Sequence, residues 1–399
     1  MTISAQQIRA YKGPAILSFG FRPFFLVAGI WTVVSLALST AMLSNLLTLP
    51  IAFTVVDWHV HEQLYGYLPA VMAGFLLTAV PNWTGRLPVV GIPLFSLVLL
   101  WVIGRLAICK SVYLGVLPTA LLDVAFLLYF AFVIGREVVA GKNWKNLKVL
   151  VLVGVMAVGN AIFHYEAANR GAAANGYGAR IGLSVAIILI MVIGGRIVPS
   201  LTRNWLVSQI PEPQLPVPFN RFDIIAMVVG MAALIMWSLL PLHQVTAYLC
   251  VLAGGVQVIR LSRWAGHLTF SEPLVFILHI GYGFVPLGFV LVGLASLFSS
   301  SITPNAAVHA WTAGAVGVMT LATMTRASLG HSGKPLMANP KTTCAYALVV
   351  LAAVLRVGSG VGDAPNGTIE LAAATWVAGF GLFLIIYAPL LLQPRSAPK

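Results

Sequence analysis

The chain has 399 residues, of which 59% are hydrophobic and 8% are charged, and its formal net charge is +13. So apolar a composition excludes a soluble domain and predicts a polytopic membrane protein. The positive charges lie between apolar runs and form no basic face, which favours Lys- and Arg-rich cytoplasmic loops over nucleic-acid binding.

Twelve apolar segments follow one another along the chain, and each is long enough to cross a bilayer core as a helix. They cover residues 22–45, 58–81, 89–108, 112–135, 147–168, 179–199, 221–241, 245–262, 272–296, 305–326, 341–360 and 368–392. We therefore expect an all-α fold with a single transmembrane domain over residues 1–399. The first segment lacks a small-residue cleavage site, so it is expected to remain as a helix.

The distribution of charge predicts the topology. With twelve spans, 18 of the 23 Lys and Arg residues fall on the side that holds the N-terminus. Because positively charged loops stay in the cytoplasm, both termini are expected to be cytoplasmic. The longest loop, residues 200–220, carries four prolines and is expected to be an extended cytoplasmic connector between two six-helix halves.

The outer end of the second segment carries the motif Asp57-Trp58-His59-Val60-His61-Glu62. Successive residues of an α-helix turn by about 100°, so His59 and His61 point to nearly opposite sides. Small residues follow on the face of His59 and leave room for a flat group, whereas Tyr65 and bulkier residues follow on the face of His61. One intramembrane histidine is often only a hydrogen-bond partner of a neighbouring helix. Two of them, with Glu62 and Tyr65 within a turn, favour a metal or haem site.

The other histidines include three candidate ligands. His309 opens the tenth segment at the expected depth of His59 and His61, and a haem iron with two axial imidazoles needs ligands from facing helices at one depth. We therefore predict that His309 and either His59 or His61 hold a haem. His164, near the outer end of the fifth segment, and His279, in the ninth, are candidates for a second metal centre such as copper. Those expected to be solvated or structural are His243, His267 and His331.

Asp123 is the one acid that the sequence centres in an apolar segment. It is expected to be either a proton-relay residue or the partner of a neighbouring helix. Together with His61, Glu62 and Tyr65 it is a candidate catalytic residue that moves protons.

The chain has no CxxCH motif, so any haem is expected to be a b-type haem without thioether links. Its propionates need cations, and Arg356 on the outer side is the first candidate. Arg22 and Arg196 also enter apolar surroundings, where they either snorkel or bind an anionic group. The three cysteines have no CxxC spacing and predict neither a zinc site nor a disulfide.

Similar residues recur at the inner ends of the second, sixth and tenth segments, at 80–86, 198–203 and 324–326. The period of four helices predicts three groups of four. This pattern resembles the catalytic subunit of haem–copper oxidases and nitric oxide reductases, in which a haem lies between histidines of helices two and ten. The resemblance is one of topology, because the copper-ligating histidines of that family are missing from segments six and seven.

Several motifs, spread over nearly the whole chain, resemble the NnrS family of bacterial inner-membrane proteins. They are Phe21–Phe25, Trp58–Glu62, Gly74–Arg86, Gly194–Pro199, Leu278–Tyr282, His309–Arg326 and Gly330–Gly333. The resemblance implies a twelve-helix protein with haem and copper that handles nitric oxide.

The leading hypothesis is therefore a haem protein, with copper as a second cofactor, that binds nitric oxide in the bilayer and reduces or detoxifies it. One alternative is a secondary transporter of a metal or small anion. Another is a haem sensor or electron-transfer subunit without turnover. The electron donor and the oligomeric state stay open.

Overall fold

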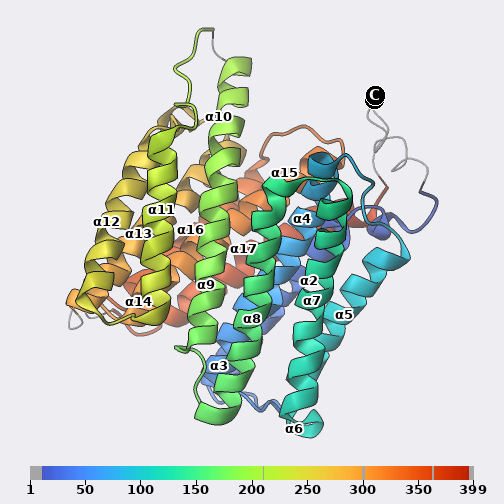
Figure 1. Cartoon of the computed structure of the whole chain (residues 1–399), viewed down its shortest axis with the longest axis vertical. Helices are drawn as coiled ribbons and strands as arrows, with labels where there is room; N and C mark the ends of the chain where they lie inside the picture. Colours follow the sequence, from blue (N-terminus) through green and yellow to red (C-terminus); the bar gives the residue numbers. More distant parts are fainter. Residues whose placement is uncertain (1–10, 210, 299–301, 362–363, 395–399) are drawn as a thin grey trace. The chain divides into compact units, whose positions relative to one another are not determined.

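The computed structural model describes residues 11–209, 211–298, 302–361 and 364–394 (Figure 1). Within these ranges the regular structure is helical apart from one isolated bridge between Ile302 and Val361. Twelve helices there are long and apolar enough to cross a membrane. The prediction of an all-α membrane protein with twelve spans is confirmed.

The first six spans are α2 (Phe21–Leu43), α3–η2–α4 (Val55–His61, Glu62–Tyr67, Leu68–Thr84), α5 (Ile92–Cys109), α7 (Val116–Ala140), α8 (Leu147–Arg170) and α9–η4–α10 (Tyr177–Leu189, Ile190–Gly194, Gly195–Gln209). The last six are α11 (Arg221–Leu239), α12 (Gln244–Ser262), α13 (Pro273–Leu297), α14–η6–α15 (Pro304–His309, Ala310–Val318, Met319–His331), α16 (Pro340–Gly358) and α17 (Thr368–Leu392). Short helical turns outside these spans are η1 (Ala15–Leu17), which precedes α2, and α6 (Ser111–Leu114), η3 (Trp144–Asn146) and η5 (Gly266–Leu268), which lie in connections.

Several spans begin where the sequence supplies a side-chain acceptor for the first free amide groups of the helix. The Thr54 hydroxyl accepts from the amide of Asp57 at the start of α3. At α11, Asn220 and Asp223 form a reciprocal capping box. Such caps matter at a membrane interface because an unpaired backbone group costs free energy once water is excluded.

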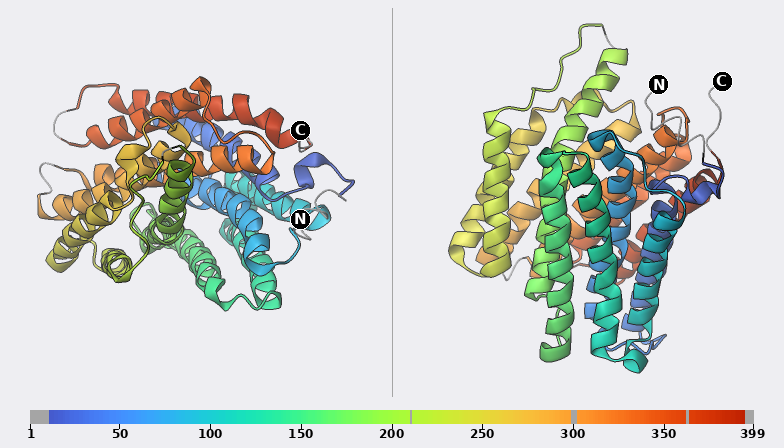
Figure 2. Two further views of the ribbon diagram at one scale, coloured as in Figure 1. Left: turned by 90° about the horizontal axis from the view of Figure 1, so that it is seen from above. Right: turned by 45° about the vertical axis from the view of Figure 1, so that its right-hand side comes forward.

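Contacts within the chain define two compact units, each described here by itself. Unit 1 comprises residues 1–185, 323–335 and 380–399, and unit 2 comprises residues 186–322 and 336–379. In unit 1, α7 packs against α4, α5 and α8, and α2 packs against α4 (Figure 2). In unit 2, α12 packs against both α11 and α13, and η6 packs against α13 and α16.

The expected connector begins later than the sequence suggests. Helix α10 continues through Pro199 to Gln209, so the extended segment covers only residues 211–220 of the described chain. Pro199 lies inside the continuous helical span Tyr177–Gln209, where it removes one backbone hydrogen bond without ending the helix. The division into two six-helix halves at this connector stays a prediction.

Three spans contain a stretch of π-helix, in which the hydrogen bonds are shifted by one residue. These stretches are η2, η4 and η6, and among the described residues they fall in the second, sixth and tenth spans. That period of four spans equals the period of the sequence repeat. The grouping into three sets of four helices stays a prediction that this recurrence supports.

Candidate metal centre

The candidate centre lies in unit 1, where α3 meets η2. The cap of Thr54 starts α3 three residues before Asp57, and the Asp57 carboxylate accepts from the amides of Ala173 and Ala174 at 2.8 and 2.6 Å. This contact joins the N-terminal end of α3 to the loop between α8 and α9. The next turn of α3 then carries His61 into the interior, where its side chain is fully buried.

His61 has an oxygen acceptor at each ring nitrogen. Nδ1 lies 2.9 Å from Glu62 Oε1, and Nε2 lies 3.1 Å from Asp123 Oδ2 and 3.0 Å from Asn160 Oδ1. Asp123 Oδ2 also accepts from the Asn160 amide at 2.7 Å and lies 3.0 Å from His164 Nε2. One carboxylate oxygen of α7 thus lies between imidazoles from α3 and α8.

Arg105 of α5 bridges the two acids of this cluster. One guanidinium nitrogen donates to both oxygens of Glu62, at 2.8 and 2.7 Å, and the other donates to Asp123 Oδ1. The indole of Trp31 donates to Glu62 at 2.7 Å. Gly66 makes room for this bridge, since a Cβ at that position would lie 2.6 Å from the guanidinium. We expected the small residues on the face of His59 to leave room for a flat group. Beside Gly66, that room is occupied by Arg105.

The charges of the cluster do not balance. Two buried carboxylates, Glu62 and Asp123, face one guanidinium, that of Arg105. With both imidazoles neutral, one negative charge is left over among side chains that are at most 5% exposed. His61 faces an oxygen acceptor at each ring nitrogen, which suits the protonated imidazole. Because burying an unbalanced charge is costly, the cluster favours one further positive charge, either a proton on His61 or a metal ion.

The donor atoms of His61, Asp123 and His164 match what a metal ion needs. One atom from each residue lies within 4.8 Å of the other two, and all three side chains are buried. An ion held at about 2.1 Å from each donor requires donors roughly 3 to 4 Å apart. Two imidazoles and one carboxylate suit copper, zinc and iron. The residues present therefore fit a transition metal ion.

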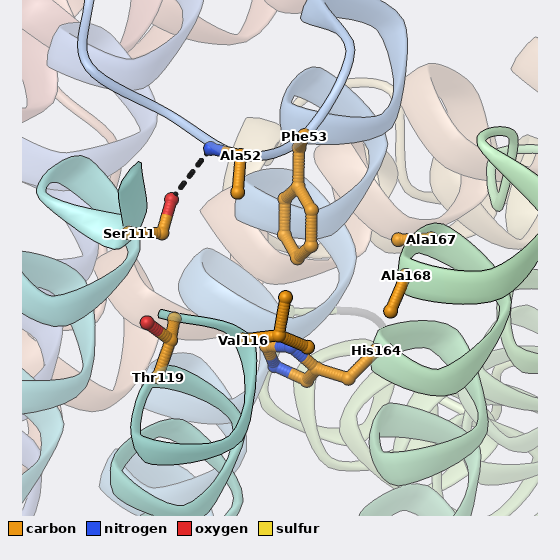
Figure 3. Close-up of a pocket in the computed structure, with 8 residues that line it drawn as sticks. All are labelled: Ala52, Phe53, Ser111, Val116, Thr119, His164, Ala167 and Ala168. Atoms are coloured by element: carbon orange, nitrogen blue, oxygen red, sulfur yellow. Dashed lines mark hydrogen bonds between the residues drawn. The ribbon is translucent and has the colours of Figure 1, made fainter. Parts of the chain in front are cut away.

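A small cavity of about 20 Å³ adjoins His164. Phe53, Val116 and His164 point into it, and Thr119, Ala167 and Ala168 line its sides (Figure 3). The Ser111 hydroxyl accepts from the amide of Ala52 at 2.7 Å and fixes the loop that covers it. A space of this volume holds about one water-sized molecule.

The family model of the NnrS protein matches residues 15–395. The chain belongs to the NnrS family. The resemblance read from the motifs is thereby confirmed, and NnrS membership supports a membrane protein of the nitric oxide response. A search of the curated proteins finds no match to this chain.

The structure brings together some of the predicted NnrS site residues. His61, Glu62, Asp123 and His164 form one cluster. The Tyr65 ring lies 5.6 Å from that of His61, but its hydroxyl donates to the carbonyl of Gly178 at 2.6 Å.

His59 and His309 lie outside this cluster. The Nδ1 atom of His59 is 3.2 Å from the Ser39 hydroxyl, and that of His309 is 2.6 Å from the carbonyl of Asn305. Hydrogen bonds at Nδ1 orient an imidazole in the way that haem ligands require. His59 belongs to unit 1 and His309 to unit 2, and their pairing stays a prediction.

The predicted propionate partners have other contacts. Arg22 is buried and donates to the carbonyls of Leu390, Leu391 and Gln393, the C-terminal end of α17. Arg356 donates to the Ser359 hydroxyl at 3.0 Å, and Arg196 is exposed. Their role in holding haem stays a prediction.

Sequence reasoning missed three members of the cluster: Arg105, Asn160 and Trp31. Arg105 lies three residues before the end of the expected segment 89–108 and is 4% exposed. Its signal was available, because an arginine inside an apolar segment needs a buried acid. Asp123 is also not the one buried acid, since Glu62, Glu137 and Asp223 are buried as well.

We expect Arg105→Met to destabilise the protein by about 3–5 kcal/mol, because two buried carboxylates then face each other without a cation. Unfolding of the purified protein in detergent measures this loss. The control is Arg86→Met, which removes one partner of Glu137 but leaves Arg136 in place. It should cost at most about 1 kcal/mol, since Arg86 is largely solvated. Equal stability of both variants would contradict a structural role for the Arg105 bridge.

Proposed function

We propose that His61, Asp123 and His164 hold a copper ion, and that the protein binds nitric oxide at this centre and reduces or detoxifies it. The observation that carries the proposal is a buried set of two imidazoles and a carboxylate whose donor atoms lie within 4.8 Å of one another. A bound cation would take the place of the proton that otherwise neutralises the cluster. Copper is the ion that the NnrS resemblance implies, and it accepts this donor set.

Copper supplies a redox-active position at which a diatomic gas can bind. The chain's own residues fix that position. Asp123 lies between the imidazoles of His61 and His164, while Arg105 and Asn160 hold its two oxygens in place. Partners of this kind orient metal ligands and tune their basicity.

The cavity beside His164 supports the proposed substrate by its size. Nitric oxide is a small, weakly polar molecule that enters lipid readily and needs no polar channel. A space of about 20 Å³ next to a candidate ligand accepts one such molecule. Larger anions would not fit without movement of Phe53 or Val116, which lie over the imidazole in Figure 3.

The cluster also offers a route for protons. Glu62 Oε1 lies 2.9 Å from Nδ1 of His61, the ring nitrogen that does not face Asp123. Groups within this range can pass a proton from one to the next. Because a donor atom that binds a metal carries no proton, we assign proton transfer to Glu62 and Nδ1 of His61, keep Asp123 as a metal ligand and give Tyr65 a packing role against His61.

A b-type haem is the second cofactor of the proposal, with His59 and His309 as candidate ligands. The hydrogen bond from His309 Nδ1 to the Asn305 carbonyl makes Nε2 the unprotonated nitrogen, which is the form that binds iron. We place the protein in the bacterial inner membrane with both termini in the cytoplasm, as the charge distribution predicts.

We expect the copper-reconstituted wild type to retain one copper ion at this centre after dialysis, and His164→Ala to bind it at least about tenfold more weakly. Metal analysis of the purified protein measures both. His243→Ala is the control, because its imidazole caps α12 in unit 2. Equal copper retention in all three proteins would mean that His164 is not a ligand of the metal. Uptake of copper into proteoliposomes without retention would instead favour the transporter alternative.

Filling the cavity beside His164 should slow the consumption of nitric oxide without removing the metal. Ala167→Leu adds three carbons to the lining of a cavity of about 20 Å³. We expect retained copper and slower nitric oxide consumption by the reduced protein at an electrode. Ala161→Leu on the exposed face of α8 is the matched control and should behave as wild type. A wild-type rate in Ala167→Leu would argue that the gas reaches the centre elsewhere.

Haem content tests the second cofactor. We expect a pyridine haemochrome signal from the wild type and its loss in His59→Ala and His309→Ala, because each removes one axial ligand. His61→Ala should keep the haem and lose nitric oxide consumption. If all three variants carry equal haem, the assignment of both ligands is wrong.

A further inference from the structure

A second cluster of charged side chains lies in unit 2, where α11 packs against α12. It consists of Asp223, Arg260 and Arg263. The carboxylate of Asp223 lies 3.1 Å from Nε of Arg260 and 3.7 Å from Nη1 of Arg263. Asp223 and Arg260 are buried, and the side chain of Arg263 is 18% exposed. His279 of the same unit lies outside this cluster, with Nε2 at 2.8 Å from the Thr202 hydroxyl, and its role as a metal ligand stays a prediction.

One carboxylate in this cluster faces two guanidinium groups, so one positive charge is left over. Loss of a proton cannot restore the balance, because arginine stays protonated in proteins. The phenol of Tyr282 accepts from Arg260 at 2.9 Å but donates to Gln257 at 2.8 Å, and it therefore keeps its proton. The C-terminal end of α12, where both arginines lie, supplies only a partial negative charge. The cluster therefore favours one further negative charge.

Each arginine has a buried guanidinium nitrogen without a hydrogen-bond partner among the described residues. These atoms are Nη2 of Arg260 and Nη1 of Arg263. The other nitrogens of Arg260 are all used, since Nε donates to the carboxylate and Nη1 donates to the carbonyl of Met191 and the phenol of Tyr282. Nearly all buried polar atoms in proteins are paired, and an exception calls for a bound water or ion. Because both unpaired groups are cationic donors, a negatively charged acceptor suits them best.

The backbone of α10 holds the guanidinium of Arg260 in place. A Cβ at Gly195, the first residue of α10, would overlap Nη2 of Arg260 and would lie 2.8 Å from its Cζ. Only glycine therefore lets the guanidinium lie directly against this backbone. Since the group is fixed before any ligand binds, little entropy is lost when Nη2 gains an acceptor.

Arg263 gives a ligand access to the cluster. It is the C-terminal cap residue of α12, and its guanidinium lies 4.7 Å from the centre of the Phe222 ring. Part of its side chain reaches the surface, whereas Arg260 and Asp223 lie deeper. A small ligand can therefore approach from the end of α12 without unfolding of a helix.

We propose that the cluster of Asp223, Arg260 and Arg263 binds one small monovalent anion. The two unpaired guanidinium nitrogens, whose side chains contact the same carboxylate, are its donors. The anion balances the remaining positive charge and supplies the missing acceptor. The site shares no residue with the His61, Asp123 and His164 centre and does not depend on the function proposed for that centre.

Equilibrium binding of radiolabelled chloride to the delipidated full-length protein, in a neutral detergent with gluconate to keep the ionic strength constant, tests this site. We expect the wild type to bind one chloride per chain. Arg263→Gln removes the surplus charge and one donor but leaves the pair of Asp223 and Arg260, so chloride affinity should fall at least about tenfold. Arg221→Gln is the matched control, because it removes an exposed arginine at the start of α11. It should bind chloride as the wild type does.

Asp223→Asn gives a change of the opposite sign, which a merely structural role would not produce. It removes the negative charge that competes with the ligand but keeps an oxygen acceptor for Nε of Arg260. Chloride should therefore bind about tenfold more tightly than in the wild type. Weaker binding in this variant would contradict the proposal.

A second arm identifies the source of the anion, since a lipid phosphate group and a free inorganic anion have the same charge. The assay is repeated in nanodiscs of phosphatidylcholine alone and of phosphatidylcholine with phosphatidylglycerol. Displacement of chloride by phosphatidylglycerol would assign the site to a lipid headgroup, and retention in both would assign it to an inorganic anion.

Two results would overturn the anion site and leave water as the partner of the unpaired nitrogens. One is the absence of bound chloride from the wild type in detergent, and the other is equal chloride affinity in the wild type and Arg263→Gln. If Asp223→Asn fails to fold, Arg263→Gln still decides, because it changes a partly exposed residue at the end of a helix.

Discussion

The bridge from Arg105 to Glu62 and Asp123 is the interaction on which unit 1 depends. It joins three elements, α5, η2 and α7, through charged groups that have almost no access to solvent. Separately, each of these charges would be very costly inside a bilayer. Together they need a defined arrangement of the helices, because a small shift would leave a carboxylate without its cation. The bridge also leaves one negative charge over, which a proton on His61 or a metal ion can balance.

The helix count and the type of fold could be predicted from the sequence because lipid imposes one simple rule. A chain crossing a bilayer must satisfy its backbone within the segment, so a long apolar run is a helix. The boundaries agree within a few residues for most spans, α13 and α17 among them. Helix α10 was ended too early because its last turns, around Arg203, are polar, although a helix that leaves the membrane can continue into water.

The candidate site could be predicted only in part. His61, Glu62 and His164 were found because a polar residue in an apolar run is itself a signal. Their grouping with Asn160 and Arg105 was not found, since it depends on which face of each helix meets which neighbour. The sequence separations are large, 99 residues between His61 and Asn160 and 43 between Glu62 and Arg105. One sequence contains no direct record of contacts over such distances.

The π-helical stretches connect these polar clusters with the repeat of four spans. A π-turn shifts the backbone register, so a carbonyl there can accept from a side chain. Two stretches have such a contact with a neighbouring helix: Gly66 of η2 accepts from Trp101, and Met191 of η4 accepts from Arg260. In η6, Gly317 accepts from Thr320 of the same helical span.

The π-helical stretch η2 of unit 1 and the stretch η4 of unit 2 each lie beside a buried arginine that is paired with an acid. Arg105 pairs with Asp123 and Glu62 near η2, and Arg260 pairs with Asp223 near η4. The recurrent feature is thus a distorted helix that offers backbone oxygen to a buried polar network. Carbonyls of ordinary helices also accept from side chains, as Gly178 of α9 does from Tyr65, because each oxygen has two lone pairs. The π-turns therefore add acceptors to the polar centres of the two units and do not alone determine where these centres form.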